Sequence, residues 1–275
     1  MDTRPHGIIS GAGSGLGLGL AARLLQRGYC LTLLDLNIDD AARRVLSSAA
    51  TADDQWHTES LDIRNAQALD DAVSAAVSAY GPVTLAIHCA GVILNRRFAD
   101  MAAEDFARVV DVNLNGSVYF AKAVLPHMKA GSRLGLIASM AGLVSNYAYA
   151  AYGASKFGVV GLATTLRYEY EPLGIGISCI CPPEVKTPMV VAERQDGDPV
   201  SLKLKDIAGS MAAPEAIDHI LAGLDAGRWM IIPGVRSRLT AGFARHCPGL
   251  FHLFMQRMIR HLLRSTTQSE THHNG

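Results

Sequence analysis

The sequence has 275 residues, 49% of them hydrophobic, which is enough for one large domain with its own core. Its 25 basic residues balance its 25 acidic ones, so the net charge gives no reason to expect a nucleic-acid partner. The 5 cysteines include no Cys-x-x-Cys pair, which argues against a disulfide framework and a zinc site, and we expect no metal.

In chain order, short apolar runs alternate with longer helical patterns. The first six residues lack the apolar core of a signal peptide, and no later apolar stretch is long enough to span a bilayer, so we expect a cytoplasmic protein. The expected strands cover residues 7–10, 30–35, 55–61, 83–89, 134–138, 175–181 and 229–232, and the expected helices cover residues 18–27, 39–50, 66–80, 102–129, 150–171 and 214–226.

Strict alternation of strands and helices implies right-handed βαβ crossovers. We therefore predict an α/β fold, a single Rossmann-type doubly wound parallel sheet flanked by helices on both faces. Residues 188–211 break the alternation, because they are polar and have no clear period, and we expect an irregular substrate lid there. We assign residues 1–248 to the domain with this lid, and residues 249–275 to an amphipathic basic helix and a polar tail.

A glycine-rich loop follows the first expected strand. It contains Gly11, Gly15 and Gly17 in the spacing Gly-x-x-x-Gly-x-Gly and leads directly into a helix. Glycine lets the backbone approach a ligand closely, and the free N–H groups at the start of a helix suit a pyrophosphate. A tight turn that packs the helix on the sheet is the alternative, but the order strand, glycines, helix, strand favours dinucleotide binding.

Two acids follow the next strands. Asp35 ends the second strand, where a carboxylate can accept the ribose hydroxyls of NAD and would repel the 2′-phosphate of NADP. Asp35 could instead cap the following helix. Asp62 follows the third strand and could either contact an adenine amino group or cap the next helix.

Tyr152 and Lys156 are four residues apart, so on a helix they share one face. A phenol has an ordinary pKa of about 10, and a nearby cation favours its ionised form. The pair alone is weak, but Ser139 ends the preceding strand and could donate to a substrate oxygen. Asn113 lies within an expected helix, where asparagine is a mediocre helix former.

Together, these motifs resemble those of the short-chain dehydrogenase/reductase family, in the family's order from Gly11 to Thr187. The resemblance implies that Asn113, Ser139, Tyr152 and Lys156 form a catalytic tetrad. It also implies a set of cofactor-binding residues: Gly11, Ser14, Gly15, Leu16, Gly17, Asp35, Leu36, Asp62, Ile63, Ala90, Gly91, Tyr152, Lys156, Pro182, Val185 and Thr187.

The sequence departs from the family pattern at two places. His88 and Cys89 stand where the family has two asparagines, so we expect the side-chain hydrogen bonds that brace the sheet to be lost. Pro183 replaces a glycine, which removes a backbone donor and fixes φ, so the path of the loop there is in doubt. Ser10 also stands where the family usually has threonine.

The resemblance implies a mechanism. Tyr152 would be the general acid in reduction and the general base in oxidation. Lys156 would lower the pKa of the phenol and hold the nicotinamide ribose, and Ser139 would polarise the carbonyl. Asn113 would hold a water in a proton relay behind Lys156.

Candidate pocket residues follow Ser139. Met140, Val144, Tyr147 and Tyr149 could line a substrate pocket, although packing explains them equally simply. At helical spacing, residues 250–264 gather apolar side chains on one face and arginines on the other. This helix could meet anionic lipid, cover another subunit or cover the lid. The helix and the Pro-Pro pair are also similar to those of 3-ketosphinganine reductases.

From the sequence we therefore expect an NAD(H)-dependent oxidoreductase that acts on CH–OH groups and interconverts a secondary alcohol and a ketone, with a hydrophobic substrate. A homodimer or homotetramer is expected, with peripheral membrane contact possible through the C-terminal helix. The alternatives are a non-catalytic NAD-sensing protein and an NADP-dependent lipid-type ketone reductase bound to the membrane surface.

Overall fold

The computed structural model describes residues 4–273. The first three residues of the segment without a signal-peptide pattern, and residues 274–275 of the predicted polar tail, lie outside the described residues. Of the helices in residues 4–273, none is both long and apolar enough to cross a membrane.

The centre of the molecule is a seven-stranded sheet whose paired strands are all parallel, in the order β3-β2-β1-β4-β5-β6-β7. The order reverses between β1 and β4, so a crevice forms at the carboxyl ends of these two strands. The strands are β1 (His6–Ser10), β2 (Cys30–Asp35), β3 (Trp56–Ser60), β4 (Val83–His88), β5 (Met128–Ile137), β6 (Gly176–Ile180) and β7 (Met230–Ile231).

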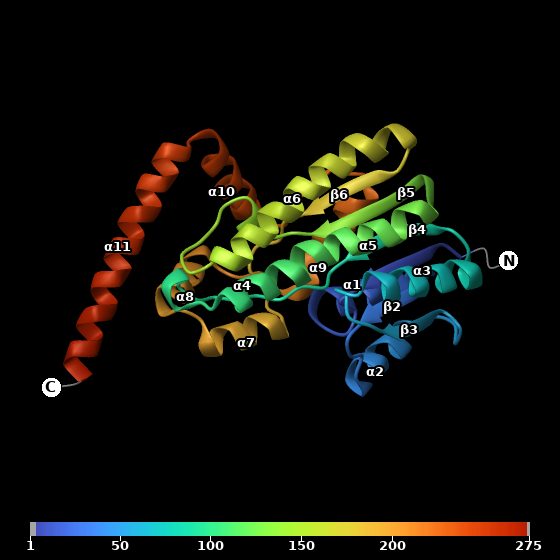
Figure 1. The fold of residues 1–275 in the computed structure, drawn as a ribbon, viewed down its shortest axis with the longest axis horizontal. Helices are drawn as coiled ribbons and strands as arrows, with labels where there is room; N and C mark the ends of the chain where they lie inside the picture. The colour runs from blue at the N-terminus through green and yellow to red at the C-terminus, as the bar shows by residue number, and fades with distance from the viewer. Residues whose placement is uncertain (1–3, 274–275) are drawn as a thin grey trace.

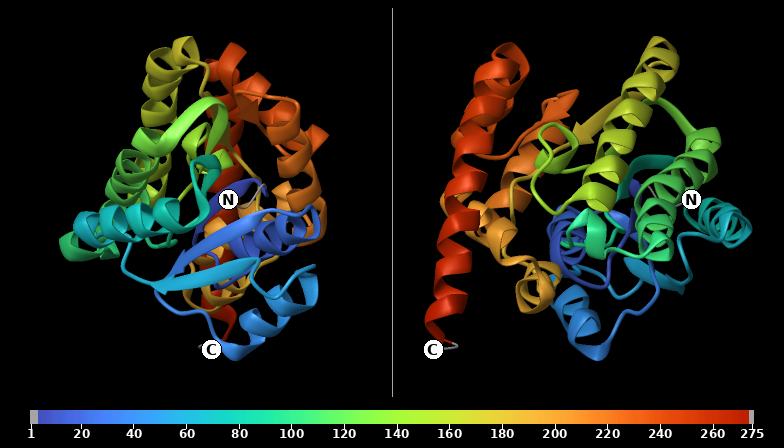
Figure 2. Two further views of the ribbon diagram at one scale, coloured as in Figure 1. Left: turned by 90° about the vertical axis from the view of Figure 1, so that its right-hand side faces the viewer. Right: turned by 60° about the vertical axis from the view of Figure 1, so that its left-hand side comes forward.

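Helices cover both faces of the sheet, and each face has its own core (Figures 1 and 2). Leu20 and Leu46 belong to the core of one face, and Phe120 and Val159 to the core of the other. The first face is covered by α1 (Gly15–Gln26), α2 (Asp40–Ala49) and α9 (Ala213–Asp225), the second by α3 (Ala66–Tyr80), α5 (Gly116–Val124) and α6 (Ala150–Tyr170), with α4 (Ala103–Val110) packed on α6. This confirms the predicted doubly wound fold.

The predicted helix at residues 102–129 is wrong in two respects. Between α4 and α5 lies a π-helical turn, η2 (Asp111–Asn115), in which the N–H of Gly116 donates to the carbonyl of Asp111. The helix then ends in the 3₁₀ turn η3 (Leu125–His127), which contains a proline, and β5 begins at Met128 rather than at residue 134. The other 3₁₀ turns are η1 (Phe98–Asp100), η4 (Met140–Gly142) and η5 (Glu171–Leu173).

The lid at residues 188–211 is not irregular as expected. It forms two helices, α7 (Pro188–Asp196) and α8 (Pro199–Ala208). Each begins with a proline in its first turn, and the carboxylate of Asp198 caps α8 by accepting from Val200 and Ser201. A polar helix two or three turns long gives too little hydrophobic periodicity to be recognised.

The C-terminal part consists of α10 (Val235–His246) and α11 (Pro248–His273). Figure 1 shows α11 as a long helix along the edge of the molecule nearest α8, and Figure 2 shows it separated from the central sheet. It packs on α8 and α10. The packing on α8 agrees with a helix that covers residues 188–211, while contact with lipid or with another subunit stays a prediction.

Candidate active site

A cavity of about 790 Å³ lies at the carboxyl ends of the strands. Its walls come from the glycine loop, from the ends of β2, β4, β5 and β6, and from the first turns of α6. The lid helices α7 and α8 and the C-terminal helix α11 complete it. Every predicted cofactor-binding residue lines this cavity.

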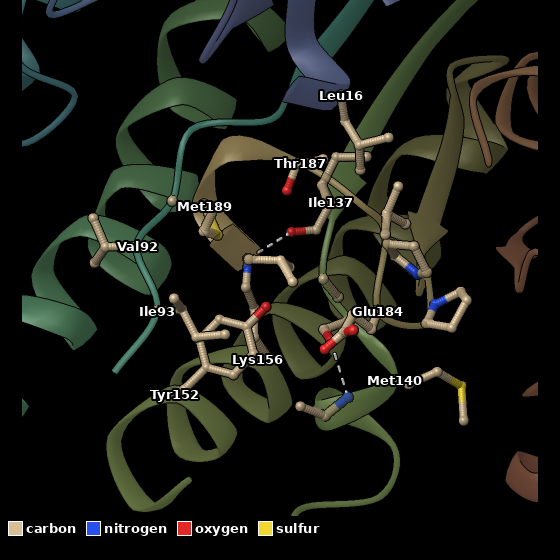
Figure 3. Close-up of a pocket in the computed structure, with 18 of the residues that line it drawn as sticks. Leu16, Val92, Ile93, Ile137, Met140, Tyr152, Lys156, Glu184, Thr187 and Met189 are labelled. Atoms are coloured by element: carbon tan, nitrogen blue, oxygen red, sulfur yellow. Dashed lines mark hydrogen bonds between the residues drawn. The ribbon is translucent and has the colours of Figure 1, made fainter. Parts of the chain in front are cut away.

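Tyr152 and Lys156 lie one turn apart on α6, near Ile137 at the end of β5 (Figure 3). Ser139 follows this strand two residues later. The hydroxyl of Ser139 lies near that of Tyr152 and lowers its pKa, and it accepts from the N–H of Ala141 at 3.1 Å. The ammonium of Lys156 lies 5.8 Å from the centre of the Tyr152 ring and donates to the carbonyl of Ile137 at 2.9 Å. Three groups that can donate a proton or a hydrogen bond therefore converge on one wall of the cavity.

Burial dominates the ionisation of the Tyr152–Lys156 pair. It raises the pKa of Tyr152 to about 12, against a smaller lowering by the neighbouring Ser139 hydroxyl. Burial also lowers the pKa of Lys156 to about 8. Tyr152 is therefore a phenol at neutral pH, the form that donates a proton to a carbonyl. The expected lowering of its pKa by Lys156 stays a prediction.

Asn113 is fully buried in the π-helical turn. Its carboxamide accepts from the N–H of Val92 at 2.8 Å and donates to the carbonyl of Val92 and to the hydroxyl of Ser155, both at 2.9 Å. A side chain at Gly91 would meet this carboxamide at 3.1 Å and the Lys156 ammonium at 3.6 Å. The asparagine thus ties the segment after β4 to α6 beside Lys156, while its role in a water relay stays a prediction.

The start of α1 fits a dinucleotide. Ser14, the residue before the helix, makes no side-chain cap, so the first N–H groups of α1 are not capped by it. A Cβ at Gly17 would lie 1.9 Å from the carbonyl oxygen of Gly11, so only glycine allows the loop to fold against the helix. Across the cavity, Thr187 would be 3.4 Å from a Cβ at Gly15. These features form a backbone cradle suited to a pyrophosphate.

The capping alternatives for the two acids are wrong. Asp39, not Asp35, caps α2, and Asn65, not Asp62, caps α3. The Asp35 carboxylate instead accepts from the N–H of Gly13 at 2.8 Å and from that of Asn37 at 3.2 Å.

Asp62 also lines the cavity, after the end of β3. It is paired with the guanidinium of Arg64 at 2.5 Å, and hydrogen bonds from Arg64 lower the pKa of this carboxyl. Both Asp35 and Asp62 thus present carboxylates to the cavity without serving as helix caps.

The expected loss of bracing at His88 is wrong as well. The imidazole Nδ1 of His88 is hydrogen-bonded to the hydroxyl of Ser10 at 2.7 Å, which joins β4 to β1. The Ser10 oxygen also accepts from the N–H of Cys89 at 3.2 Å. Burial, together with the charge of Lys156, lowers the pKa of His88 to about 3, so the ring is neutral. A serine–histidine pair therefore supplies a link across the sheet.

The path of the loop around Pro183 is fixed from both sides. The carbonyl of Pro182 accepts from Met140 at 2.9 Å, and the carbonyl of Glu184 accepts from Met211 at 2.8 Å. The N–H of Lys186 donates in turn to Met211 at 3.0 Å. The donor that proline lacks is therefore not needed to hold this segment.

Of the candidate pocket residues, Met140, Val144 and Tyr149 line the cavity, but Tyr147 does not. The sequence pattern did not indicate Glu184 in the loop after β6 or Lys205 in the lid, whose polar side chains reach the cavity. It also did not indicate the apolar residues of α11 that line the cavity: Phe251, Phe254, Met255 and Met258. Asp198 directly before Pro199 is a helix-start pattern that could have revealed α8.

Comparisons with known proteins show which family the chain resembles over most of its length. The family model described as short chain dehydrogenase matches residues 6–198. A 3-dehydrosphinganine reductase of Arabidopsis thaliana is 34% identical over 234 residues, which cover 82% of this chain and 70% of that protein. Cyclohexanol dehydrogenase of Acinetobacter sp. (strain SE19) is 32% identical over 220 residues, 79% of this chain and 86% of that protein.

Some relatives are longer than this chain. A 3-ketodihydrosphingosine reductase of Bos taurus is 29% identical over 218 residues, but the match covers only 65% of that protein. Among solved structures, a short chain dehydrogenase/reductase from Burkholderia phymatum in complex with NAD has a TM-score of 0.78 and 25% identity, covering 90% of this chain and 95% of that chain. Levodione reductase has a TM-score of 0.75 and 27% identity, covering 83% and 95%.

Proposed function

The chain belongs to the short-chain dehydrogenase/reductase family of oxidoreductases, and from this we propose that it interconverts an apolar ketone and its secondary alcohol with NAD(H). The observation that carries the proposal is the convergence of Ser139, Tyr152 and Lys156 in the wall of a large cavity, with the Lys156 ammonium 5.8 Å from the centre of the Tyr152 ring. Relatives named as sphinganine-type ketone reductases and as cyclohexanol dehydrogenase support this substrate class.

The chain's own groups would divide the work as follows. Tyr152, a neutral phenol at pH 7, donates its proton to the carbonyl oxygen of the substrate during reduction. Ser139 donates a hydrogen bond to the same oxygen, where negative charge develops. When bound, the dinucleotide supplies the hydride. Asn113 keeps the segment after β4 fixed against α6, which holds Lys156 in place.

Two observations support NAD over NADP. The Asp35 carboxylate stands at the end of β2 beside the glycine loop, where it would repel a 2′-phosphate. Arg64, which lines the same end of the cavity, is already paired with Asp62. The measurement is kcat/KM with NADH and with NADPH. We expect Asp35→Ser to shift the ratio toward NADPH by at least about tenfold, roughly 1.4 kcal/mol. A native preference for NADPH would overturn this choice of cofactor.

The apolar side chains of the cavity's outer wall support the proposal that the substrate is apolar. Met140 and Val144 line one side, Met189 of α7 another, and Met255 and Met258 of α11 a third. We therefore expect 3-dehydrosphinganine and cyclohexanone to be reduced in preference to keto sugars, which offer little apolar surface to such a wall.

The decisive experiment compares wild type with Tyr152→Phe in NADH oxidation by a panel of these ketones. Loss of the proton donor should lower kcat by roughly 10²- to 10⁴-fold. Tyr147→Phe is the matched control, because Tyr147 lies in the same segment but outside the cavity wall. Equal turnover by wild type and Tyr152→Phe would sink the mechanism. NAD binding without turnover of any ketone or alcohol would instead favour the NAD-sensing alternative.

One observation favours peripheral membrane contact as an additional property. Between residues 229 and 269 the sequence has no Asp or Glu, and its charged side chains are Arg236, Arg238, Arg245, Arg257, Arg260 and Arg264. On α11, Leu250, Leu253 and Phe254 are exposed among these arginines. Basic helices with exposed apolar residues bind anionic membrane surfaces. Sedimentation with anionic vesicles, but not with neutral ones, should be lost when residues 249–275 are deleted. Binding that survives the deletion would exclude α11 as the contact.

A further inference from the structure

A carboxylate that plays no part in the mechanism above is buried beside the catalytic tyrosine. The side chain of Glu193, on α7, is 1% exposed. One of its oxygens accepts from the hydroxyl of Tyr149 at 2.5 Å and from the amide of Asn95 at 2.9 Å. The other pairs with the ammonium of Lys205 on α8. A buried carboxylate is stable only with such partners, so these four residues are held together as one unit.

Tyr149 connects this unit to the catalytic centre. It is buried, and its ring packs edge-on against that of Tyr152 with the ring centroids 5.3 Å apart. Burial and the charge of Glu193 raise the pKa of Tyr149 far above its ordinary value, so its hydroxyl stays a hydrogen-bond donor. The charge of Glu193 also contributes to the raised pKa of Tyr152. Glu193 therefore acts on the Tyr152 phenol in two ways: through Tyr149, which packs against it, and through its negative charge, which raises the pKa of Tyr152.

The backbone around Tyr149 is held in an unusual shape. Ala148 has φ 62°, a left-handed conformation that is uncommon for residues other than glycine. Its carbonyl accepts from the N–H of Arg96 at 2.9 Å. The neighbouring carbonyl of Asn95 accepts from Asp198 at 3.3 Å, at the start of α8. One short segment after β4 thus fixes both Tyr149 and the lid, and strain of this kind persists only where the surroundings enforce it.

Two further ion pairs tie the lid to the loop after β6. Lys205 also pairs with Glu184 at 2.6 Å, and Glu184 pairs with Arg194 of α7 at 2.8 Å. Glu184 directly precedes Val185, one of the predicted cofactor contacts. The lid is therefore joined through Tyr149 to the segment that precedes Tyr152, and through Glu184 to the loop that carries the predicted cofactor contact Val185.

We propose that Glu193 and Tyr149 are positioning residues, a latch through which the closed lid fixes the catalytic Tyr152 for proton transfer. The inference rests on the proposed function for its catalytic part. Other groups that face Tyr152 are Ser139, Lys156 and Cys181, and the latch links it to α7 and α8.

The test uses the full chain as wild type, Tyr149→Phe and Glu193→Gln. Glu171→Gln is the control, because Glu171 forms an exposed ion pair with Arg167 at the far end of α6. We expect the single-turnover rate of ketone reduction to fall roughly ten- to hundredfold in Tyr149→Phe, since small displacements of reacting groups cost this much. The Kd for NADH should stay within about twofold of wild type, because the dinucleotide cradle is untouched.

Two further measurements separate positioning from a general loss of structure. Glu193→Gln removes a negative charge that raises the pKa of Tyr152, so its rate of alcohol oxidation should begin to rise at a lower pH than in wild type. Tyr149→Phe, which keeps that charge, should lack this shift. The double variant should be no slower than the slower single variant, because both substitutions break one unit.

Hydrogen exchange tests whether Tyr149 and Glu193 hold the lid in place, and this measurement does not require catalytic activity. Amides of residues 188–208 should exchange faster in Tyr149→Phe than in wild type and Glu171→Gln. Unchanged exchange would overturn the latch, whether or not the wild type reduces a ketone. Faster exchange with an unchanged reduction rate would overturn its link to Tyr152. If the wild type reduces no ketone but exchange rises as expected, the proposed function fails and the latch stands as a lid fastening alone.

Discussion

The cavity is built in two different ways by the two parts of the chain. Up to residue 187, its walls are strand ends, the start of α1 and the first turns of α6, so the groups are placed by the backbone of a rigid sheet. From residue 188 to residue 265, the walls are helices that pack on one another and are joined to the first part by side-chain pairs such as Lys205–Glu184 and Glu193–Tyr149. The family match ends at residue 198, close to this boundary. We assign the proposed reaction to the first part and the selection of the substrate to the second.

The largest effect that would test this division is expected at Gly17. In Gly17→Ala the new Cβ would lie 1.9 Å from the carbonyl oxygen of Gly11, so the loop must move away from α1. We expect the Kd for NADH to rise by about a hundredfold, roughly 2.7 kcal/mol. Isothermal titration would measure it. Gly161→Ala is the control, since a Cβ there meets nothing within 4 Å. Normal NADH binding by Gly17→Ala would break the division.

A smaller effect, confined to the substrate, is expected on α11. Met255→Ala together with Met258→Ala removes apolar surface from the outer wall of the cavity. The KM for a long-chain ketone should rise by about tenfold, since each lost contact costs on the order of 1 kcal/mol. The KM for cyclohexanone and the Kd for NADH should change little. Arg260→Gln, on the exposed face of α11, is the matched control.

An increase in the Kd for NADH in the methionine variant would contradict the separation of the two parts. It would mean that α11 supports the cofactor wall as well as the substrate wall. An equal rise in KM for the long and the small ketone would instead show that α11 closes the cavity as a whole rather than binding a chain.

The same division explains how far the sequence could be interpreted. The parallel sheet follows from alternating apolar periods, and the glycine loop, Asp35 and the Tyr152–Lys156 pair were placed in one cavity because parallel strands end at one edge. The π-helical turn at Asn113 was not predicted, since one extra residue in a helix leaves no compositional trace. Its cause is visible only in the hydrogen bonds of the asparagine to Val92.

The lid shows why the remainder could not be predicted. Glu193 and Lys205 are charged residues in a polar segment, which by pattern alone belong at the surface. They are buried because their partners, Tyr149 and Asn95, come from segments far away in the sequence. Pairings of this kind depend on the tertiary fold. The Ser10–His88 pair shows a different limit. The family pattern predicts a lost hydrogen bond at His88 and a conservative change at Ser10, but the two residues bond to each other, which neither position indicates alone.

The smallest effect is expected in stability, at this Ser10–His88 pair. Removing the hydroxyl in Ser10→Ala leaves the buried imidazole without its hydrogen bond and should lower the free energy of unfolding by about 1 kcal/mol, whereas Ser10→Thr keeps the hydroxyl. The pair also predicts a pH dependence. The pKa of His88 is about 3 in the folded protein and about 6.5 when unfolded, so between these values the unfolded chain binds more protons. Its contribution to stability is therefore complete above about pH 6.5 and is lost as the pH falls toward 3.

Urea unfolding at pH 7.5 and at pH 5 would measure this dependence. His6 and His57, whose pKa values are also lowered by burial, add to the same slope, so the comparison with His88→Asn isolates the part that belongs to His88. The variant should lose less stability than wild type between the two pH values. If both lose the same amount, folding does not lower the pKa of His88, and the imidazole is protonated at pH 5 in the folded protein. It then cannot accept the proton of the Ser10 hydroxyl, and the link between β1 and β4 would have to be reversed, with the imidazolium donating to Ser10.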